Sequence, residues 1–382
     1  MHPLQLLRRA IKNNPEDFQV EEVVDLIFDD SGEYSYYLLK KRNINTILVL
    51  DLIQRYWKVS RDKIGFCGLK DKRAVTIQYI SIKNGPEKDL TGPNFILKFL
   101  GKGKTPLKLG EAKGNVFTII LRGVNSYKMM NSLKLLREIG FANYFGEQRF
   151  APDLYTKKPL VKYFLQNDYE GALKEYFTQH PKKSKTLKKL WGEWEKFLKT
   201  ASHLSAVEKR VLLTYIKKGD PVKAFKVFPK HLKLLFFFSY QSLLWNRVLS
   251  RAIKRLDEKS ICIRFVRKEQ LCFYRDEVII PKVFSDFELP FISPEIMDQE
   301  LPSVFREEVD RVIEEERLTD FLESKALGLK IFNPGKRKVC VKPEDLKVVN
   351  VTKHTFTLRF FLPSGSYATI FLLKLLLLSQ RF

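Results

Sequence analysis

Alternating apolar and polar residues run through much of the first 150 positions and predict β-strands. The segment 17–41 alternates on either side of Ser31 and Gly32, which predicts a hairpin with its turn at those two residues. Two other stretches repeat their apolar residues at helical spacing; one is expected to use Thr46 as its N-cap, and the other to end at Gly140. Further strands are expected at 64–69, 75–82, 94–103 and 115–124. This part of the chain therefore predicts an α+β fold with mainly antiparallel strands.

The pattern changes after residue 151. Between about 157 and 231 the apolar residues keep helical spacing, lysines are dense and strand patterns are few. Strand alternation returns before an apolar C-terminal tract, which is too short to span a bilayer and therefore predicts a buried terminal helix. The later segments are an amphipathic helix at 239–256, short strands with Pro-rich turns over 260–350, strands over 347–362, a turn at 363–365 and the apolar tract at 370–378.

The charge balance points to a polyanionic partner. The chain has 68 Lys and Arg against 44 Asp and Glu, for a formal net charge of +24. Such an excess attracts nucleic acid, because Lys and Arg that neutralise phosphates release counterions; a membrane surface is the second candidate. A lysine-rich, heat-adapted composition is an alternative, but it usually raises Glu as well, and here Glu does not keep pace.

Two tryptophans, Trp191 and Trp194, lie in the lysine-dense segment and allow two interpretations. Aromatic rings among cations can stack on the bases of a nucleic acid while the cations follow its backbone. Alternatively, the rings pack inward from an amphipathic helix and the lysines are simply solvated. The sequence does not choose between the two.

The cysteines and histidines suggest neither a metal site nor a disulfide scaffold. None of the four cysteines forms a C-x-x-C pair, and the five histidines are scattered. Unpaired cysteines fit a reducing cytosol, and the N-terminus lacks the apolar stretch of a signal peptide. A cytoplasmic protein without a metal is therefore expected. The cysteines are Cys67, Cys262, Cys272 and Cys340.

Common catalytic motifs are absent, which leaves a loop carboxylate as the first chemical candidate. There is no phosphate-binding P-loop, no dinucleotide fingerprint, no H-E-x-x-H and no G-x-S-x-G. Asp71 lies between Lys70 and Lys72 in a loop that joins two predicted strands, and neighbouring cations favour an ionised carboxylate. Such a group can act as a nucleophile, but aspartate is also common in ordinary turns.

Two other segments could contact a nucleic acid. In 143–150, which reads NYFGEQRF, an amide could read a base edge, aromatic rings could stack, and an arginine could hold phosphate. In 362–369, a Pro-Ser-Gly turn opens a predicted helix whose backbone amides could bind an anion. The simpler alternatives are packed aromatic residues in the first segment, and a turn capped by Ser366 or Thr369 in the second.

Together these segments resemble the signature blocks of the TruD pseudouridine synthases, in the same order along the chain. The catalytic pattern GxKDxxAxTxQ is the most specific, and similarity is weaker between about 152 and 345. The pattern is formed here by Gly68, Lys70, Asp71, Ala74, Thr76 and Gln78. The resembling blocks are 14–22, 46–82, 114–122, 143–150, 240–250 and 358–369.

The resemblance implies roles for particular residues. Asp71 matches the nucleophilic aspartate, Phe18 and Asn143 match substrate contacts, and Phe145 matches an aromatic residue beside the target uracil. Further substrate contacts are implied for Tyr367, Lys12 and, through the RNA backbone, Arg149. The chain departs from the family at Ala151, where glycine is usual, and at Ala142, where proline is common, so the path of this loop is in question.

The resemblance also implies a fold and an activity. The fold would be an α+β pseudouridine synthase core, a mainly antiparallel mixed sheet with flanking helices over 1–150 and 345–382, with a helix-rich α+β TruD-specific domain inserted over 151–344. The activity would be isomerisation of a uridine in tRNA, usually uridine 13, to pseudouridine. No cofactor, metal or membrane partner is implied, and the oligomeric state is open, with a monomer compatible.

Two alternatives remain at this point. One is an RNA-binding or RNA-chaperone protein without catalysis, which the retained Asp71 and Asn143 argue against. The other is a membrane-surface or DNA-binding protein, for which no matching amphipathic helix or helix-turn-helix is evident.

Overall fold

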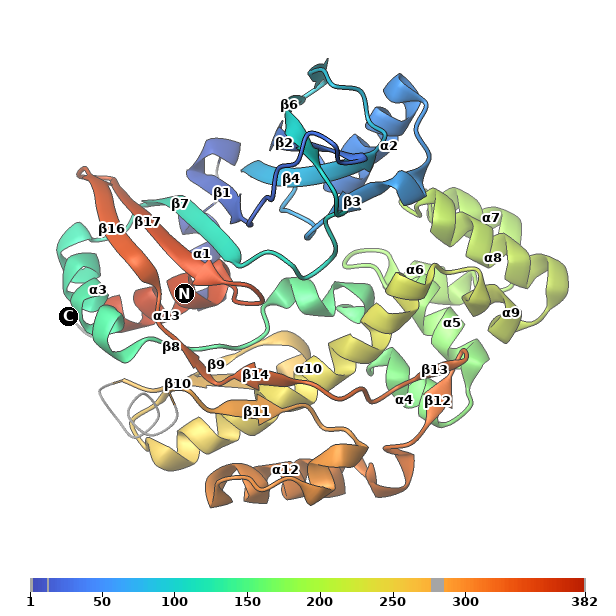
Figure 1. The fold of residues 1–382 in the computed structure, drawn as a ribbon. Helices are drawn as coiled ribbons and strands as arrows, with labels where there is room; N and C mark the ends of the chain where they lie inside the picture. The colour runs from blue at the N-terminus through green and yellow to red at the C-terminus, as the bar shows by residue number, and fades with distance from the viewer. Residues whose placement is uncertain (1–2, 12–13, 276–284, 381–382) are drawn as a thin grey trace. The chain divides into compact units, whose positions relative to one another are not determined.

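A computed structural model of the chain describes residues 3–11, 14–275 and 285–380 (Figure 1). The chain divides into two compact units, which we call the first and the second unit. The first unit comprises residues 1–143 and 341–382, and the second comprises residues 144–340. The second unit is therefore continuous in sequence and interrupts the first.

One mixed sheet forms the first unit. Its strands follow the order β16-β17-β7-β1-β4-β2-β6-β5, and β3 pairs with β4. The pair β1 and β4 is parallel, whereas the other pairs of this sheet are antiparallel. This confirms the predicted α+β class with mainly antiparallel strands. The strands are β1 (Phe18–Val23), β2 (Tyr34–Arg42), β3 (Ile64–Phe66), β4 (Val75–Lys83), β5 (Leu90–Gly92), β6 (Phe95–Gly103), β7 (Gly114–Arg122), β16 (Glu344–Val351) and β17 (Thr355–Pro363).

The predicted hairpin over 17–41 is wrong, although both of its strands exist. Strand β4 lies between β1 and β2, with Thr76 opposite Val20 on one side and Lys41 on the other. The ten residues between β1 and β2 are more than a tight hairpin turn uses. Alternation predicts which face of a strand is buried but not which strand lies beside it.

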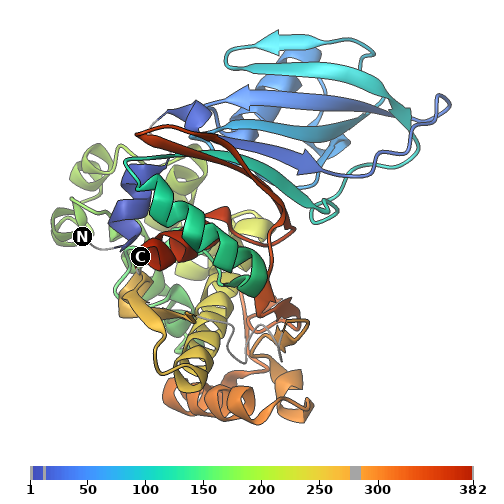
Figure 2. The ribbon, with the colours of Figure 1, turned by 90° about the vertical axis from the view of Figure 1, so that its left-hand side faces the viewer.

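Helices cover the buried face of this sheet. Residues directly opposite each other on paired strands point to the same face of the sheet. The register of β2, β4, β1, β7 and β17 therefore brings the buried side chains of these strands onto one face. Helix α2 (Thr46–Trp57) packs there through Val49, Leu50 and Ile53. Three helices gather beside β7, β16 and β17 (Figure 2). They are α1 (Pro3–Ala10), α3 (Ser126–Ile139) and α13 (Ala368–Ser379).

The observed helix ends partly match the predicted ones. Helix α3 ends at Gly140, whose positive φ of 64° is one that glycine adopts without strain. The predicted N-cap of α2 is wrong, because the side chain of Asn45, rather than Thr46, accepts the hydrogen bond from the amide of Ile47 at 2.8 Å. Thr46 is the first residue of the helix, which leaves its hydroxyl available for another contact.

The second unit is rich in helices and contains short strand pairs. Its central helix, α10, is 27 residues long and carries a largely buried run from Phe236 to Ile253. Its helices are α4 (Leu160–Leu165), α5 (Tyr169–Thr178), α6 (Ser184–Lys189), α7 (Trp194–Thr200), α8 (Ala206–Lys218), α9 (Pro221–Lys226), α10 (Lys230–Leu256) and α12 (Ser303–Glu316). Its strand pairs are β9 (Ile261–Arg264) with β10 (Gln270–Phe273), β11 (Glu288–Pro290) with β14 (Lys336–Lys338), and β12 (Lys325–Ala326) with β13 (Leu329–Lys330).

Two expectations about individual residues are settled in the second unit. Cys262 and Cys272 face each other across β9 and β10 and form a disulfide, so the expectation that the cysteines are unpaired is wrong for these two. Sequence spacing could not show this, because the strand register brings them together. The rings of Trp191 and Trp194 contact each other and Tyr215, with centroids 5.1 to 5.9 Å apart, which favours the packing interpretation.

The described ranges contain neither a helix that could span a membrane nor a cluster of metal-binding side chains. No helix there has the length and apolarity needed to cross a bilayer. Nor do three His, Cys, Asp or Glu side chains gather there in a way that could hold a metal ion.

Candidate active site

A buried lysine holds the backbone of the loop that carries Asp71. The loop joins β3 to β4, and Lys41, near the end of β2, is 1% exposed beneath it. Its Nζ donates hydrogen bonds to three backbone carbonyl oxygens, those of Asp71 (2.7 Å), Ile44 (3.0 Å) and Lys70 (3.4 Å). Three carbonyls use all three N–H donors of an ammonium group. Burial lowers the pKa of Lys41 to about 8, and the Asp71 carboxylate opposes this effect.

The residue before Asp71 is anchored in the sheet. Lys70 Nζ lies 2.6 Å from Glu22 Oε1 and 2.8 Å from Asn115 Oδ1, and the Lys70 and Glu22 side chains are 8% and 0% exposed. The second oxygen of Glu22 accepts a hydrogen bond from the amide of Tyr79 at 3.0 Å. Buried charges are tolerated when they are paired and hydrogen-bonded in this way. Lys70 therefore ties the loop to β1 and β7.

Two buried polar side chains support the same loop from below. The Thr46 hydroxyl donates to Gln78 Oε1 at 3.2 Å and accepts from the amide of Lys70 at 3.3 Å. Gln78 in turn donates to the carbonyl of Gly68 at 3.1 Å. These contacts give a structural reason for the glutamine of the GxKDxxAxTxQ pattern and for the threonine at the start of α2.

Phe18 is the first residue of β1 and lies beside the point where the Asp71 loop enters the neighbouring strand β4. Strand β1 runs parallel to β4 with Gln19 opposite Val75, so the first residue of β1 lies at the level of the residue before β4. Phe18 is 1% exposed, and the preceding residue, Asp17, is fully buried. The Asp17 carboxylate accepts from Arg122 Nη2 on β7 at 2.6 Å. This ion pair fixes the start of β1 and hence the position of Phe18.

A chain of ring contacts connects Phe18 to the segments that carry Asn143 and Tyr367. Asn143, which is buried, follows Phe141 by two residues, and Tyr367 lies directly before α13. One aromatic cluster of the first unit therefore connects Phe18 to the segments in which Asn143 and Tyr367 lie, through Phe141 and Phe371. The successive pairs are Phe18–Phe117 (6.1 Å), Phe117–Phe360 (5.5 Å), Phe360–Phe371 (4.4 Å) and Phe371–Phe141 (5.8 Å) between ring centroids.

Phe145 and Arg149 belong to the second unit. The Phe145 ring is buried against Trp245, with centroids 5.6 Å apart, and the guanidinium carbon of Arg337 lies 4.2 Å from its centroid. Arg149 donates to the hydroxyl of Ser242 at 3.1 Å and also lies over the Phe145 ring. The side chain of Asn246 bonds to both backbone polar groups of Phe145. Its Oδ1 accepts from the Phe145 amide at 2.9 Å, and its Nδ2 donates to the Phe145 carbonyl at 3.0 Å.

Sequence reasoning assigned no role to two residues that hold the Asp71 loop, Lys41 and Glu22. The sequence did contain a signal for Lys41. Tyr37 and Leu39 are apolar and two residues apart, so residue 41 is expected on the same buried face of the strand. A lysine at a predicted buried position indicates a specific partner. The predicted substrate contact Lys12 lies outside the described residues.

Comparisons with known proteins agree across the chain. Residues 7–375 match the family model described as tRNA pseudouridine synthase D (TruD). A tRNA pseudouridine synthase D of Aquifex aeolicus is 38% identical over 96% of this chain and 97% of its own length. A relative from Methanocaldococcus jannaschii, described as a probable tRNA pseudouridine synthase D 2, is 33% identical over 94% of this chain and 90% of its own. A crystal structure from Methanosarcina mazei, assigned to the same group, has a similar fold, with a TM-score of 0.66 and 23% identity over 96% of this chain and 93% of that one.

Proposed function

The chain belongs to the tRNA pseudouridine synthase D family, and on this premise we propose that it converts uridine 13 of tRNA into pseudouridine with Asp71 as the nucleophile. The observation that carries this proposal is the support of the Asp71 loop. Lys41, Lys70, Thr46 and Gln78 hold it by buried polar contacts. An ordinary surface turn does not need such support, whereas a reacting carboxylate must be held in place.

The proposed reaction exchanges one bond of the nucleoside for another. The Asp71 carboxylate attacks C1′ of the ribose, the N1–C1′ bond breaks, and the uracil leaves as an anion. The uracil then rotates, its C5 attacks C1′, and the carboxylate is released. The proton on C5 is lost and N1 gains one, so atoms and charge balance. The sequence of steps is redox-neutral and involves no phosphoryl transfer, so it requires no cofactor.

The remaining predicted residues have supporting roles in this proposal. The target uridine must leave its stack to be reached, and Phe18, Phe145 and Tyr367 would stack against it or fill the space around it. Asn143 would read its polar edge, and Arg149 would hold the RNA backbone. Lys12 is proposed as a further substrate contact. We also propose that the first unit is the catalytic core and the second unit the TruD-specific domain, and that the enzyme acts on tRNA in the cytoplasm.

The direct test uses unmodified tRNA transcribed with uridine that carries tritium at C5. Formation of the C5–C1′ bond expels that hydrogen, so we expect tritium to be released into water, in an amount equal to the pseudouridine mapped at position 13. Release without modification at position 13 would contradict the assigned target. Tight binding of tRNA without any release would support an RNA-binding protein instead.

Replacing Lys41 with Met should lower kcat by about 10- to 100-fold with little change in KM. The change leaves three buried carbonyls without their donor, which costs on the order of 1–3 kcal/mol and loosens the Asp71 backbone. Lys40, the exposed neighbour on the opposite face of β2, is the matched control, and Lys40→Met should leave kcat unchanged. Thermal melting of both variants checks that they fold.

The pH profile separates this positioning role from a general loss of packing. The ammonium form of Lys41 is the donor to all three carbonyls, and its pKa is about 8. Wild-type kcat should therefore fall as the pH rises above 8, and this descending limb should be absent in Lys41→Met. Asp71 and Lys70 are the charged groups that face Lys41. An unchanged limb in the variant would refute the role of Lys41.

A further inference from the structure

A cationic groove lies between two helices of the second unit and has no part in the chemistry described above. It has a volume of about 590 Å³ and is lined by one face of α8 and by residues of α9 and the turn after it. The opposite face of α8 is buried through Val211, Leu212 and Tyr215. Helix α8 thus packs with its apolar face and presents its cations to the groove.

The lining of this α8–α9 groove carries positive charge only. It includes five cations, of which Lys223 pairs with Asp220 at 3.1 Å. In the part of the chain that the structure describes, the other four have no carboxylate within ion-pair distance. Among the described residues, no Asp or Glu lines the groove. The four are Lys209, Arg210, Lys217 and Lys218.

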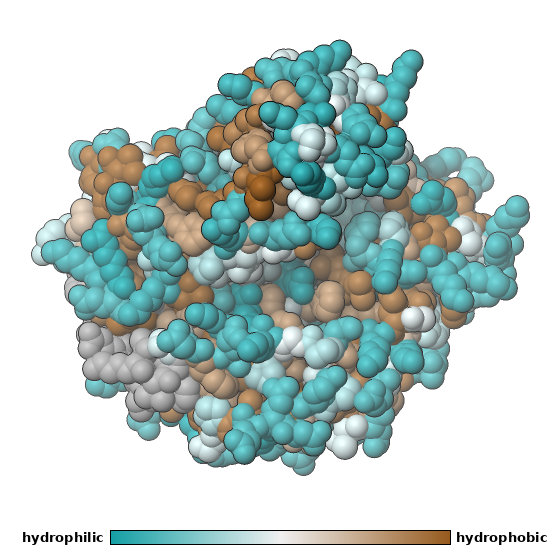
Figure 3. Space-filling model, in the orientation of Figure 1, coloured by the Kyte–Doolittle hydropathy of each residue, from teal (hydrophilic) through white to brown (hydrophobic). Residues whose placement is uncertain are grey.

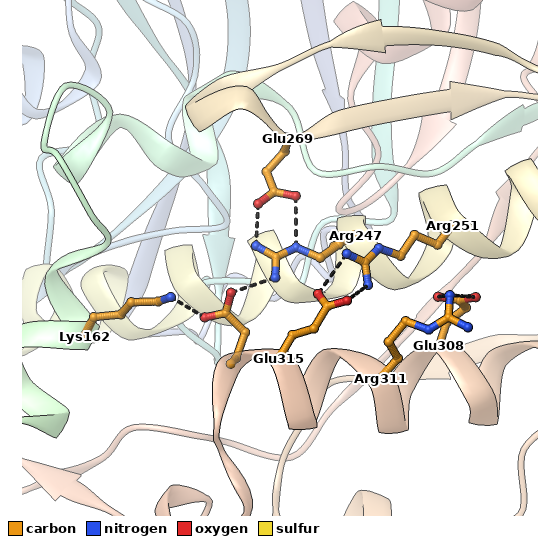
Figure 4. Close-up of polar contacts among 8 residues, drawn as sticks. Lys162, Arg247, Arg251, Glu269, Glu308, Arg311 and Glu315 are labelled. Carbon is orange, nitrogen blue, oxygen red and sulfur yellow. Dashed lines mark hydrogen bonds and ion pairs between the residues drawn. The ribbon is translucent and has the colours of Figure 1, made fainter.

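A second basic cavity of the same unit shows what makes this groove different. That cavity, of about 550 Å³, is lined by Arg247 and Arg251 but also by Glu269 and Glu315. Figure 4 shows that both guanidinium groups already hold carboxylates: Arg247 contacts Glu269, and Arg251 contacts Glu315 at 2.8 Å. A phosphate that bound these two arginines would have to displace their carboxylate partners. The α8–α9 groove offers its cations to a ligand without that cost.

The spacing of the cations fits an extended polyanion. Lys209 and Lys217 are eight residues apart, which is about 12 Å along a helix at roughly 1.5 Å per residue. A strand of duplex DNA advances about 3.4 Å per nucleotide along its axis, and on that scale this stretch matches roughly three to four phosphates. Between the cations, Leu213 is 51% exposed and offers an apolar contact to a sugar. The surface over α8 and α9, at the right of Figure 3, shows hydrophilic side chains with apolar ones between them.

We propose that the α8–α9 groove binds the phosphate backbone of the RNA substrate, as a binding site separate from the residues that contact the uridine. The choice of RNA as the ligand rests on the proposed function. The inference does not depend on Asp71 being the nucleophile. Phosphate contacts of this kind position a nucleic acid without reading its sequence. They strengthen binding through counterion release and leave the reacting groups untouched.

The test neutralises the four groove cations together, as Lys209→Gln, Arg210→Gln, Lys217→Gln and Lys218→Gln in the full chain. Binding of unmodified tRNA is measured by fluorescence anisotropy between 50 and 300 mM KCl. Each lost phosphate contact should reduce the slope of log Kd against log salt by about 0.9, so the variant should lose about 3 to 4 units of slope. At about 150 mM salt its Kd should rise at least 10-fold, on the same counterion argument, while kcat at saturating tRNA stays unchanged.

The control makes the same charge change where each lysine already has a carboxylate. It replaces Lys196, Lys199, Lys336 and Lys338 with Gln, whose partners are Glu193, Glu195, Glu288 and Asp286. This control should bind tRNA as the wild type does. Equal losses in both variants would mean that only net charge matters and would overturn the proposal, as would wild-type binding by the groove variant.

Two further outcomes are informative. If the groove variant keeps its affinity for tRNA but loses binding to vesicles containing phosphatidylserine, the groove serves an anionic membrane and the proposal is wrong. If wild type releases no tritium from tRNA, yet tRNA binding depends on the four groove cations and not on the control lysines, the proposed catalytic function fails while the groove assignment stands. The two proposals can therefore fail separately.

Discussion

Replacing Asp71 with Asn is expected to abolish pseudouridine formation, by about 10⁴-fold or more in kcat, because enzymes that lose their nucleophile lose activity on that scale. Asn keeps the size of the side chain but is too weak a nucleophile to attack C1′. The fold should be retained, since the hydrogen bond from Lys41 to the main-chain carbonyl of Asp71 does not depend on the replaced side chain. The measurement is tritium release from C5-labelled tRNA, together with tRNA binding and thermal melting.

A matched control comes from an exposed turn. Asp30→Asn removes the same charge from a residue in the connection between β1 and β2 and should leave kcat within about twofold, because surface substitutions away from special features are nearly neutral. The variant Asp71→Glu moves the carboxylate by one methylene and should also be severely impaired, since near-attack geometry tolerates little displacement. Release of tritium by Asp71→Asn at the wild-type rate would contradict the assignment of the nucleophile.

Replacing Arg247 with Met is expected to destabilise the second unit by about 3–5 kcal/mol, the usual cost of removing one partner of a buried ion pair. Arg247, 15% exposed, joins two carboxylates: it contacts Glu269 and lies 2.7 Å from Glu316. Tyr240 and Lys162 also donate to Glu316. Met would leave both carboxylates without their shared cation. Urea unfolding followed by tryptophan fluorescence measures the loss, since three of the four tryptophans belong to this unit.

Arg311 provides the comparison within the same region of Figure 4. It lies 3.2 Å from Glu308, whose side chain is 3% exposed, but Arg311 itself is 55% exposed, and ion pairs that solvent screens contribute at most about 1 kcal/mol. Arg311→Met should therefore change the free energy of unfolding by less than about 1 kcal/mol. Similar effects of the two substitutions would show that the network around Arg247 has no special role in stability.

The same network predicts an acid limit to stability. Burial alone would raise the pKa of Glu316, but hydrogen bonds from Lys162, Tyr240 and Arg247 outweigh it and hold the pKa at about 2. A carboxyl whose pKa is lower in the folded state stabilises the fold above its unfolded value of 4.5. That contribution should be lost as the pH falls from about 4.5 towards 2, and the loss should be smaller in Arg247→Met.

Local patterns were enough for the elements and the fold class. Strict alternation over 75–82 predicted β4, and the returning alternation near the C-terminus predicted the strands that became β16 and β17. The pairing of strands was not predictable in the same way. Strand β4 comes between β1 and β2, although those two are consecutive in sequence. Alternation depends on one strand and the core it faces, whereas pairing depends on all strands at once.

For the candidate site, the sequence identified the loop but not what holds it. The GxKDxxAxTxQ pattern pointed to Asp71, yet read alone this residue was better explained as a turn aspartate between lysines. Its supports come from distant positions, with Lys41 on β2, Glu22 on β1 and Thr46 on α2. The disulfide between Cys262 and Cys272 was missed for the same reason, since it depends on the register of two strands.

The sequence by itself determined the α+β class, the basic character of the chain and the place of Asp71 in a loop between strands, because these follow from composition and from the spacing of neighbouring residues. Only the tertiary structure decided that Lys41 is buried beneath Asp71 and that the cations of α8 line a groove without carboxylates. Whether a lysine is a solvated charge or a buried donor depends on which groups the fold places around it.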